Sequence, residues 1–392
     1  MQKKMTVFLL IMTAVLYGYG CAAESHEIRE NGQHTDANRN SVITEEVLTV
    51  KFIDVGQGNA VLAEMNGAYM LIDGGDRDYA SYVVSYLKKQ GVEELQYVIA
   101  SHYDADHLNG IVGVLHAFPC EKVLAADYTT DTKIYESFLS VVDEKNITVE
   151  YPDMGEVYSF GEAEFTIVCP DAYDYDDAND NSIGIRLVHG ENSFLICGDA
   201  GEKVEDVMVH SGLNIQADVY MASHHGSAGS SSEEFLRGVA PEVVVISAGL
   251  GNSYGHPAKR VMEAVEDIEA DIYRTDLQGE IIVICNGNQM SWNVEPSSDY
   301  RSGEELVAAG VTEGNQTESN TGNENHLGSE KKSESQDGGW EERFILNTNT
   351  KKFHEPSCSS ADEIAEENRA EFTGTKEDLL DAGYSSCGRC KP

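Results

Sequence analysis

Four potential metal ligands lie within six consecutive residues of this chain. They are His102, Asp104, Asp106 and His107, and they directly follow an apolar stretch of strand length. Imidazole nitrogens and carboxylate oxygens suit Zn²⁺ and Mn²⁺. Two imidazoles and two carboxylates on one turn can supply two adjacent ions, so the spacing indicates a dinuclear metal site. The alternative interpretation is a polar loop that happens to be rich in Asp and His.

Further ligand-type residues end other apolar stretches of the chain. Asp73 ends the run Ala-Tyr-Met-Leu-Ile-Asp, Asp199 ends Phe-Leu-Ile-Cys-Gly-Asp, and the pair His224-His225 follows Val-Tyr-Met-Ala-Ser. A fourth run, Val-Val-Val-Ile-Ser, leads to His256. Short apolar runs bounded by Gly, Asp or Ser are typical of buried strands. We therefore expect these polar side chains to gather along one rim of a sheet.

Stretches with helical character alternate with these strands. They cover residues 78–90, 202–210, 232–238 and 258–268. Such alternation indicates an α/β domain with its polar residues at strand ends. The region 46–295 contains all the ligand-type residues described above, and a domain of about 250 residues can bury a substantial core.

Taken in order, the motifs resemble those of the metallo-β-lactamase superfamily and, within it, the ComEC-like hydrolase domain of DNA-uptake proteins. The resemblance covers residues 46–295 and rests on Asp54-Val-Gly-Gln-Gly-Asn, Asp73-Gly-Gly, the run 102–107, Asn181-Ser182, Gly-Asp199, His224-His225-Gly and Tyr254-Gly-His256-Pro. The superfamily more often carries His where this chain has Asp104, and an Asp there is the pattern of the ComEC-like branch. The resemblance implies a four-layer αβ/βα sandwich, two mixed sheets back to back with helices outside.

The resemblance also implies which residues bind metal. We expect His102 and Asp104 to hold one ion, Asp106 and His107 to hold the other, Asp199 to bridge them, and His225, or alternatively His224, to complete the second site. Asn181-Ser182 stands where many members place a further His, which leaves the completion of the first site open. Two divalent cations can activate a water near neutral pH and stabilise charge on a substrate oxygen.

Other residues are expected to support the reaction. The expected catalytic residues are Asp106, His256 and His224. Asp106 would act through the metal that it binds. The two histidines would contact the substrate phosphate or protonate a leaving group. Asp73 and Asn181 are expected to orient the ligands from behind.

The charge of the chain bears on the substrate. The sequence has 27 Lys and Arg against 68 Asp and Glu, a formal net charge of −41. Because Lys and Arg supply most non-specific affinity for nucleic acid, this surface should repel a long polyanion unless a local patch or a bound metal intervenes. We expect a phosphodiesterase, with DNA as the favoured substrate and a phosphorylcholine or other cell-surface phosphoester as the alternative.

Two other classes of function are open at this stage. A β-lactamase or lactonase would use the same metals but is expected to keep a His-x-His start. A surface binding module with a degenerate site is the second, and the intact ligand set argues against it.

The N-terminus indicates export. A basic start with Lys3 and Lys4 precedes an apolar stretch, residues 7–17, that is too short for a comfortable membrane span. Cys21 then resembles the modified cysteine of a bacterial lipoprotein, with simple secretion or an uncleaved anchor as the alternatives. We expect residues 1–23 to be the export signal and 24–45 a polar tether, which would place the enzyme on the extracellular face of the cell membrane.

The C-terminal region divides into a linker and a small folded unit. Residues 296–342 are rich in Glu, Ser, Asn, Gly and Thr with few large hydrophobes, which predicts a disordered acidic linker. Residues 343–392 carry the spaced group His354, Cys358, Cys387 and Cys390. Three thiolates and one imidazole can close a tetrahedral structural zinc site, and a unit of this size needs such a staple.

This unit resembles the Ada-type zinc-binding domain. That family uses four Cys, and His354 stands at the position of the first. We expect a structural or binding module with one zinc ion. Disulfides are the alternative in an exported protein, but three cysteines fit disulfides poorly.

Overall fold

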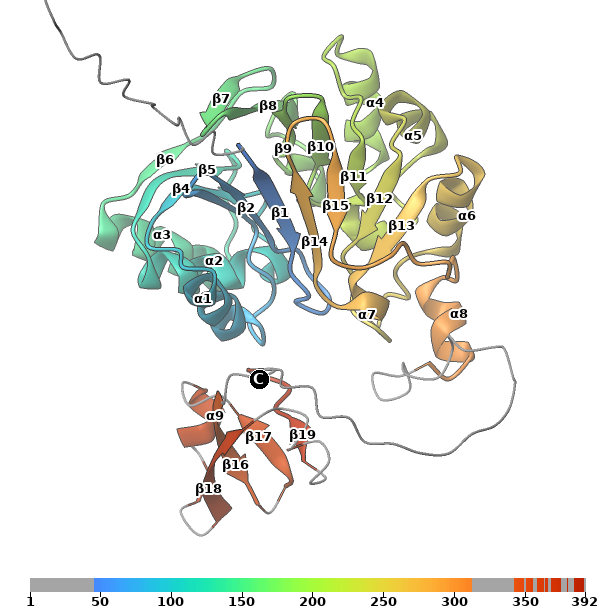
Figure 1. The fold of residues 1–392 in the computed structure, drawn as a ribbon. Coiled ribbons are helices and arrows are strands. Elements are labelled where there is room, and N and C mark those ends of the chain that lie inside the picture. The colour runs from blue at the N-terminus through green and yellow to red at the C-terminus, as the bar shows by residue number, and fades with distance from the viewer. Residues whose placement is uncertain are drawn as a thin grey trace, which may run out of the picture. The chain divides into compact units, whose positions relative to one another are not determined.

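The computed structural model describes residues 46–311 and, in the C-terminal unit, residues 342–390 apart from 349, 355–357, 363, 366–367, 375–378 and 380–383. These two folded parts are described separately (Figure 1). The expected export signal with Cys21 and the tether 24–45 lie outside the described residues. None of the described helices is both long and apolar enough to span a membrane.

The first sheet of the larger part has eight strands, in the spatial order β15-β14-β1-β2-β3-β4-β5-β6. Their bounds are β1 Leu48–Phe52, β2 Val61–Met65, β3 Ala68–Ile72, β4 Leu95–Ala100, β5 Cys120–Ala125, β6 Thr148–Glu150, β14 Ile281–Cys285 and β15 Met290–Trp292. Strands β3 to β6 run parallel, and β1 pairs antiparallel with β2 and β14. Its helices are α1 Ala80–Lys89, α2 Ala105–Ala117 and α3 Lys133–Lys145.

The second sheet has seven strands, in the order β13-β12-β11-β10-β9-β8-β7. Their bounds are β7 Val157–Phe160, β8 Ala163–Cys169, β9 Gly184–His189, β10 Asn192–Ile196, β11 Val219–Met221, β12 Val243–Ile246 and β13 Asp271–Arg274. Strands β10 to β13 run parallel. The helices and helical turns of this half are η1 Asn179–Asn181, α4 Glu202–His210, η2 Ser223–Gly226, α5 Glu233–Val239, α6 Lys259–Asp267, α7 Thr275–Gln278 and α8 Gly303–Ala308.

The two sheets pack face to face through apolar side chains. Val50 and Ile99 of the first sheet share one buried cluster with Ile185 and Phe194 of the second. A second cluster joins the other face of the second sheet to α4, α5 and α6. Figure 1 shows α1, α2 and α3 outside one sheet and α4, α5 and α6 outside the other. This arrangement confirms the four-layer αβ/βα sandwich that the motifs predicted.

The chain stays folded beyond residue 295, where the sequence predicted a disordered linker. Ser297 pairs with Ile272 of β13, and α8 begins with a capping box in which Ser302 and Glu305 bond each other's backbone. Leu306 is fully buried. The predicted boundary is therefore wrong, and the larger part continues to residue 311. The polar composition predicted disorder here because it does not reveal that one buried leucine and two capping residues are enough to stabilise a short helix.

The C-terminal unit is a small four-stranded sheet in the order β18-β16-β17-β19, with one short helix. Its elements are β16 Glu342–Asn347, β17 Lys352–His354, α9 Ser359–Asp362, β18 Arg369–Gly374 and β19 Ser385–Ser386. Alternate residues of β16 supply two small cores, Ile345 on one face and Phe344 with Leu346 on the other. Cores of this size rarely stabilise a fold alone, so a metal staple is physically reasonable.

Candidate metal centre

The predicted ligands lie at the carboxyl ends of strands from both sheets. Asp73 follows β3, His102 follows β4, Asp199 follows β10 and His225 follows β11. Because β3 and β4 run parallel, as do β10 and β11, their ends meet at a common rim. His225 adopts a left-handed backbone with φ of 56°. Strained backbone of this kind is characteristic of residues held for function.

One group of ligand atoms comes from the start of α2 and the end of β11. Asp106, His107 and His225 each place a ligand atom within 4.8 Å of the others. His225 Nε2 lies 3.3 Å from Asp106 Oδ2 and 3.5 Å from Asp199 Oδ2. These are the residues that were expected to hold the second ion. Of the two candidates for its last ligand, His225 rather than His224 lies in this group.

A second group shares a histidine with the first. His102, His107 and Asp199 also place ligand atoms within 4.8 Å of one another, and the His102 and His107 rings are 4.2 Å apart. His107 Nε2 lies 3.2 Å from Asp199 Oδ1. The sequence assigned His107 to one ion alone, whereas the structure places it in both groups.

Asp104 lies at the open side of the second group. Its Oδ2 is 3.9 Å from His102 Nε2, and the side chain is 53 % exposed. Asp104 is the N-cap residue of α2, but its side chain makes no capping hydrogen bond. Its carboxylate lies next to His102, but Asp104 is in neither of the two groups of converging ligand atoms, so its role as a ligand of the first ion stays a prediction.

The buried atoms of this cluster fit divalent cations. The Nε2 atoms of His102, His107 and His225 and the Oδ1 atom of Asp199 have no hydrogen-bond partner in the described part of the chain. Their nearest polar neighbours belong to the same cluster, as for His107 Nε2 and Asp199 Oδ1 at 3.2 Å. Buried polar atoms are nearly always bonded, so this convergence fits the binding of cations between them. Imidazole nitrogen with carboxylate oxygen is a donor set for Zn²⁺ or Mn²⁺.

Asp73 fixes the orientation of His107. Its carboxylate accepts hydrogen bonds from the Ser101 backbone nitrogen at 2.9 Å, the Ser101 hydroxyl at 2.8 Å and His107 Nδ1 at 2.8 Å. With Nδ1 of His107 directed at Asp73, Nε2 is the ring nitrogen that faces the cluster, and a cation bound there would displace its proton. His225 is oriented in the same way, since its Nδ1 donates to the Ser247 carbonyl at 3.0 Å.

Two serines to which sequence reasoning assigned no role support the cluster. The Ser182 hydroxyl accepts from the Asp199 backbone nitrogen at 3.1 Å and lies 3.3 Å from His102 Nδ1. The Ser101 hydroxyl lies 3.1 Å from the same His102 atom. Both serines are sequence neighbours of predicted site residues, which is the signal that could have found them.

Asn181 occupies a different place from the one expected. Its side chain bonds Tyr175 and Asp177, which closes the preceding loop. No hydrogen bond joins it to a predicted ligand among the described residues. The expectation that Asn181 orients a ligand directly is therefore wrong, and its neighbour Ser182 makes those contacts instead.

The charges of the cluster compensate one another. Burial opposes the charged form of His107, but Asp199 and Asp73 hold its pKa well above the usual value. Burial likewise opposes ionisation of Asp199, but His107 and His225 hold its pKa well below the usual value. Against burial, His225 lowers the pKa of Asp106 to about 2. The carboxylates are therefore ionised at neutral pH and ready to bind cations.

His224 and His256 stand at the mouth of the site. The His224 side chain is 29 % exposed, with Nε2 3.7 Å from Asp199 Oδ2, and its ring lies 5.7 Å from that of His256. Burial and then the neighbouring His225 and His224 lower the pKa of His256 to about 4. His256 is therefore neutral at physiological pH, which suits contact with a substrate better than storage of a proton.

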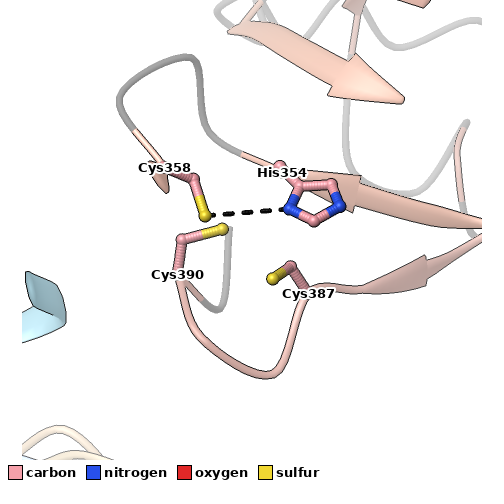
Figure 2. A group of neighbouring side chains, drawn as sticks. All are labelled: His354, Cys358, Cys387 and Cys390. Carbon is pink, nitrogen blue, oxygen red and sulfur yellow. Dashed lines mark hydrogen bonds between the residues drawn. The ribbon is translucent and has the colours of Figure 1, made fainter. Parts of the chain in front are cut away.

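The C-terminal unit brings its four predicted ligands together. His354, Cys358, Cys387 and Cys390 place ligand atoms within 4.8 Å of one another, and Figure 2 shows them converging from β17, the loop after it and the turn after β19. His354 Nδ1 lies 3.7 Å from Cys358 Sγ, and the three cysteines form no disulfide.

The electrostatics of this group favour a metal-binding thiolate. Burial opposes ionisation of Cys387, but backbone N–H groups of Cys390 and Arg389 lower its pKa below the usual value. Cys358, Cys387 and His354 are buried, and Cys390 is half-buried. Three thiols and one imidazole in such an arrangement are the donor set of a tetrahedral zinc site. Zinc and the Ada-type resemblance stay predictions.

Comparison with known proteins identifies a matching family model and several related proteins. A family model described as the metallo-beta-lactamase superfamily matches residues 53–249. ComE operon protein 3 of Bacillus subtilis (strain 168) is 26 % identical over 269 residues, which cover 64 % of this chain and 34 % of that protein. Competence protein ComA of Neisseria gonorrhoeae is 29 % identical over 245 residues, covering 62 % and 33 %. The chain thus spans about a third of the length of these relatives.

Among solved structures, the metallo-beta-lactamase fold protein YhfI from Bacillus subtilis aligns with a TM-score of 0.45 and 14 % identity, covering 61 % of this chain and 100 % of that one. The family model spans half of the present sequence and includes His102, Asp106, His107, Asp199 and His225. The two relatives named above are ComEC-like competence proteins. The chain therefore belongs to the metallo-β-lactamase superfamily of metal-dependent hydrolases.

Proposed function

We propose that residues 46–311 form a phosphodiesterase that uses two divalent ions, Zn²⁺ or Mn²⁺. The observation that carries this proposal is the pair of adjacent ligand groups that share His107 and flank Asp199. Adjacent cations suit in-line displacement at phosphorus, because they can hold both the attacking and the leaving oxygen. The same arrangement also serves other esters, so the choice of phosphodiester rests on the relatives.

The residues divide the work of such a reaction. Bound divalent ions would polarise a phosphoryl oxygen and acidify a water. Asp106 and His225 hold one side of the site, and His102 with Asp104 holds the other. His224, partly exposed at the mouth, is placed to bond a phosphate oxygen or the leaving group. Neutral His256 behind it donates or accepts a hydrogen bond without adding charge.

DNA is the favoured substrate in this proposal. One relative is named as a competence protein, and competence is the capacity of cells to take up DNA. The net charge of −41 works against a long polyanion and supports the alternative, a phosphorylcholine or other cell-surface ester. We also propose, on sequence alone, that the protein is exported and anchored through a lipid on Cys21. Loss of the protein from the membrane fraction on Cys21→Ala would support this anchor, and its retention there would contradict it.

Hydrolysis of bis-p-nitrophenyl phosphate by the full chain tests the activity. Protein stripped with a chelator should be inactive and should regain turnover with Zn²⁺ or Mn²⁺. Asp106→Ala should abolish turnover and lower the metal content, because it removes a ligand atom from the group that contains His225. Asp143→Ala, an exposed acid on α3, is the matched control. Failure to bind metal, or metal binding without any turnover, would refute the phosphodiesterase.

A further inference from the structure

An aromatic side chain stands exposed beside the metal centre. Tyr254 is 69 % exposed, the largest fraction among the exposed large hydrophobic residues in the described ranges. Its ring lies almost parallel to that of His256, at 5.6 Å and 24°. The His256 ring in turn is nearly parallel to that of His225, at 6.4 Å and 26°. The three rings form a column that runs from a metal ligand to the surface, and Tyr254 is its outer end.

The loop that carries this tyrosine is held by its own hydrogen bonds. Asn252 Oδ1 accepts from the backbone nitrogens of Tyr254 at 3.1 Å and His256 at 3.0 Å, and its Nδ2 donates to the His256 carbonyl at 2.6 Å. Gly255 has φ of +74°, and a Cβ there would lie 2.6 Å from Glu304 Cγ. A ring on such a loop loses little freedom when it meets a ligand, which lowers the entropic cost of binding.

A pocket of about 240 Å³ opens beside the ring. Its lining includes Tyr254, His256, Ser227, Lys259 and Glu304. The Lys259 ammonium lies 2.7 Å from a Glu305 carboxylate oxygen and 3.6 Å from one of Glu263. The positive charge is therefore already compensated, and it cannot be the main attraction for a phosphate chain. The exposed ring face is the most distinctive recognition element of this pocket.

We propose that Tyr254 is a stacking platform for a nucleobase next to the scissile phosphodiester, so that the site takes single-stranded nucleic acid. The inference rests on the proposed phosphodiesterase. Stacking of a base on an aromatic ring is tolerant of sequence and adds affinity without basic residues. It therefore explains how a chain with a net charge of −41 can hold a nucleic acid close to its metals.

A choline headgroup fits the same pocket less well. Quaternary ammonium groups are bound by cages of several aromatic rings. Tyr254 is the one tyrosine in the pocket lining, and the lining has no tryptophan or phenylalanine. The inner face of the Tyr254 ring is turned toward His256, which leaves one face for a ligand. One free face is enough for a base but does not make a cage.

Steady-state kinetics of the full-length, metal-loaded protein on a single-stranded oligodeoxynucleotide test the platform. Tyr254→Leu should raise KM roughly five- to a hundred-fold, because it removes one stacked base. Tyr254→Phe keeps the ring and should restore KM. An oligonucleotide without a base beside the cleaved bond should have a raised KM for the wild type, and Tyr254→Leu should add nothing further. Tyr151→Leu, at an exposed tyrosine after β6, is the control and should keep the wild-type KM.

Binding measured without turnover separates this inference from the proposed function. The fluorescence of an oligonucleotide that carries 2-aminopurine should be quenched when it binds the full-length Asp106→Ala protein. The double variant Asp106→Ala, Tyr254→Leu should not quench this fluorescence. Quenching that depends on Tyr254 without any phosphodiester hydrolysis by the wild type would support the platform and refute the phosphodiesterase. Unchanged KM and quenching in Tyr254→Leu would overturn the platform. An equal loss of kcat on all substrates in Tyr254→Leu would also overturn the platform. A rise in KM confined to p-nitrophenyl phosphorylcholine would overturn it as well.

Discussion

At the scale of single residues, the orientation of each ligand is as important as its identity. Asp73 illustrates this, because it binds His107 and Ser101 through one carboxylate. Asp73→Asn should lower metal affinity about ten- to a hundred-fold, the usual cost of losing a group behind a ligand. The amide puts a donor where an acceptor is needed. Asn also tolerates the φ of 57° at this position, so the backbone gains no strain.

Metal titration of the chelated protein measures the effect of Asp73→Asn. Asp78→Asn, at an exposed acid in the same loop, is the control and should bind as the wild type does. Equal affinity in Asp73→Asn and wild type would show that His107 is held in place by packing alone.

The candidate ligands could be named from the sequence because Asp and His at the ends of apolar runs are visible in one dimension, and the structure brings most of them together. It could not reveal that His107 lies in both ligand groups. That depends on how the first turn of α2 is placed relative to the end of β10. The roles of Ser101 and Ser182 were missed for a similar reason. A serine beside a ligand has many possible partners, and only the fold selects one.

At the scale of elements, α2 is brought against the loop after β3 by two glycines. A Cβ on Gly110 would lie 1.8 Å from the Gly74 carbonyl oxygen, and one on Gly74 would lie 2.4 Å from the Ile111 nitrogen. Since both close neighbours are backbone atoms, neither can move without moving its element. This approach positions Asp106 and His107 in the first turn of α2 beside Asp73.

Gly110→Ala should therefore destabilise the fold by roughly 1–3 kcal/mol, the range for an overpacked core, and weaken metal binding. Gly113→Ala is a matched control on the same helix, because its Cβ would meet Val84 Cγ2 at an ordinary 3.5 Å. That change should be neutral or stabilise by up to about 1 kcal/mol through helix propensity. Urea unfolding of the metal-free proteins and metal titration give both quantities. Equal stability of the two variants would contradict the close packing.

The helices were predictable to within two residues where their apolar positions repeat, as for α4 at 202–210 and α6 at 259–267. The helix α8 was missed because it buries few residues and its capping residues, Ser302 and Glu305, are also typical of linkers. A domain boundary that depends on one buried leucine and two hydrogen bonds is hard to recognise from the amino-acid composition.

At the scale of the whole molecule, two folded parts share one chain but differ in the size of their apolar cores. The larger part has extensive cores and would keep its fold with its cluster altered, whereas the C-terminal unit has only small cores around Ile345 and Phe344. Stability of the small unit should therefore depend on its ligand group, since metal binding free energy becomes folding free energy where cores are small.

His354→Ala in the full chain should lower the bound zinc by one equivalent and make Cys358 and Cys387, both buried in the wild type, reactive toward a thiol reagent. Hydrolysis of bis-p-nitrophenyl phosphate should be unchanged, because the larger part holds its own ligands. His354→Cys should restore the zinc, since a thiolate can replace an imidazole in such a site. His210→Ala, at an exposed histidine of α4, is the control. Wild-type protein with unreactive cysteines but no zinc in this unit would instead support disulfides.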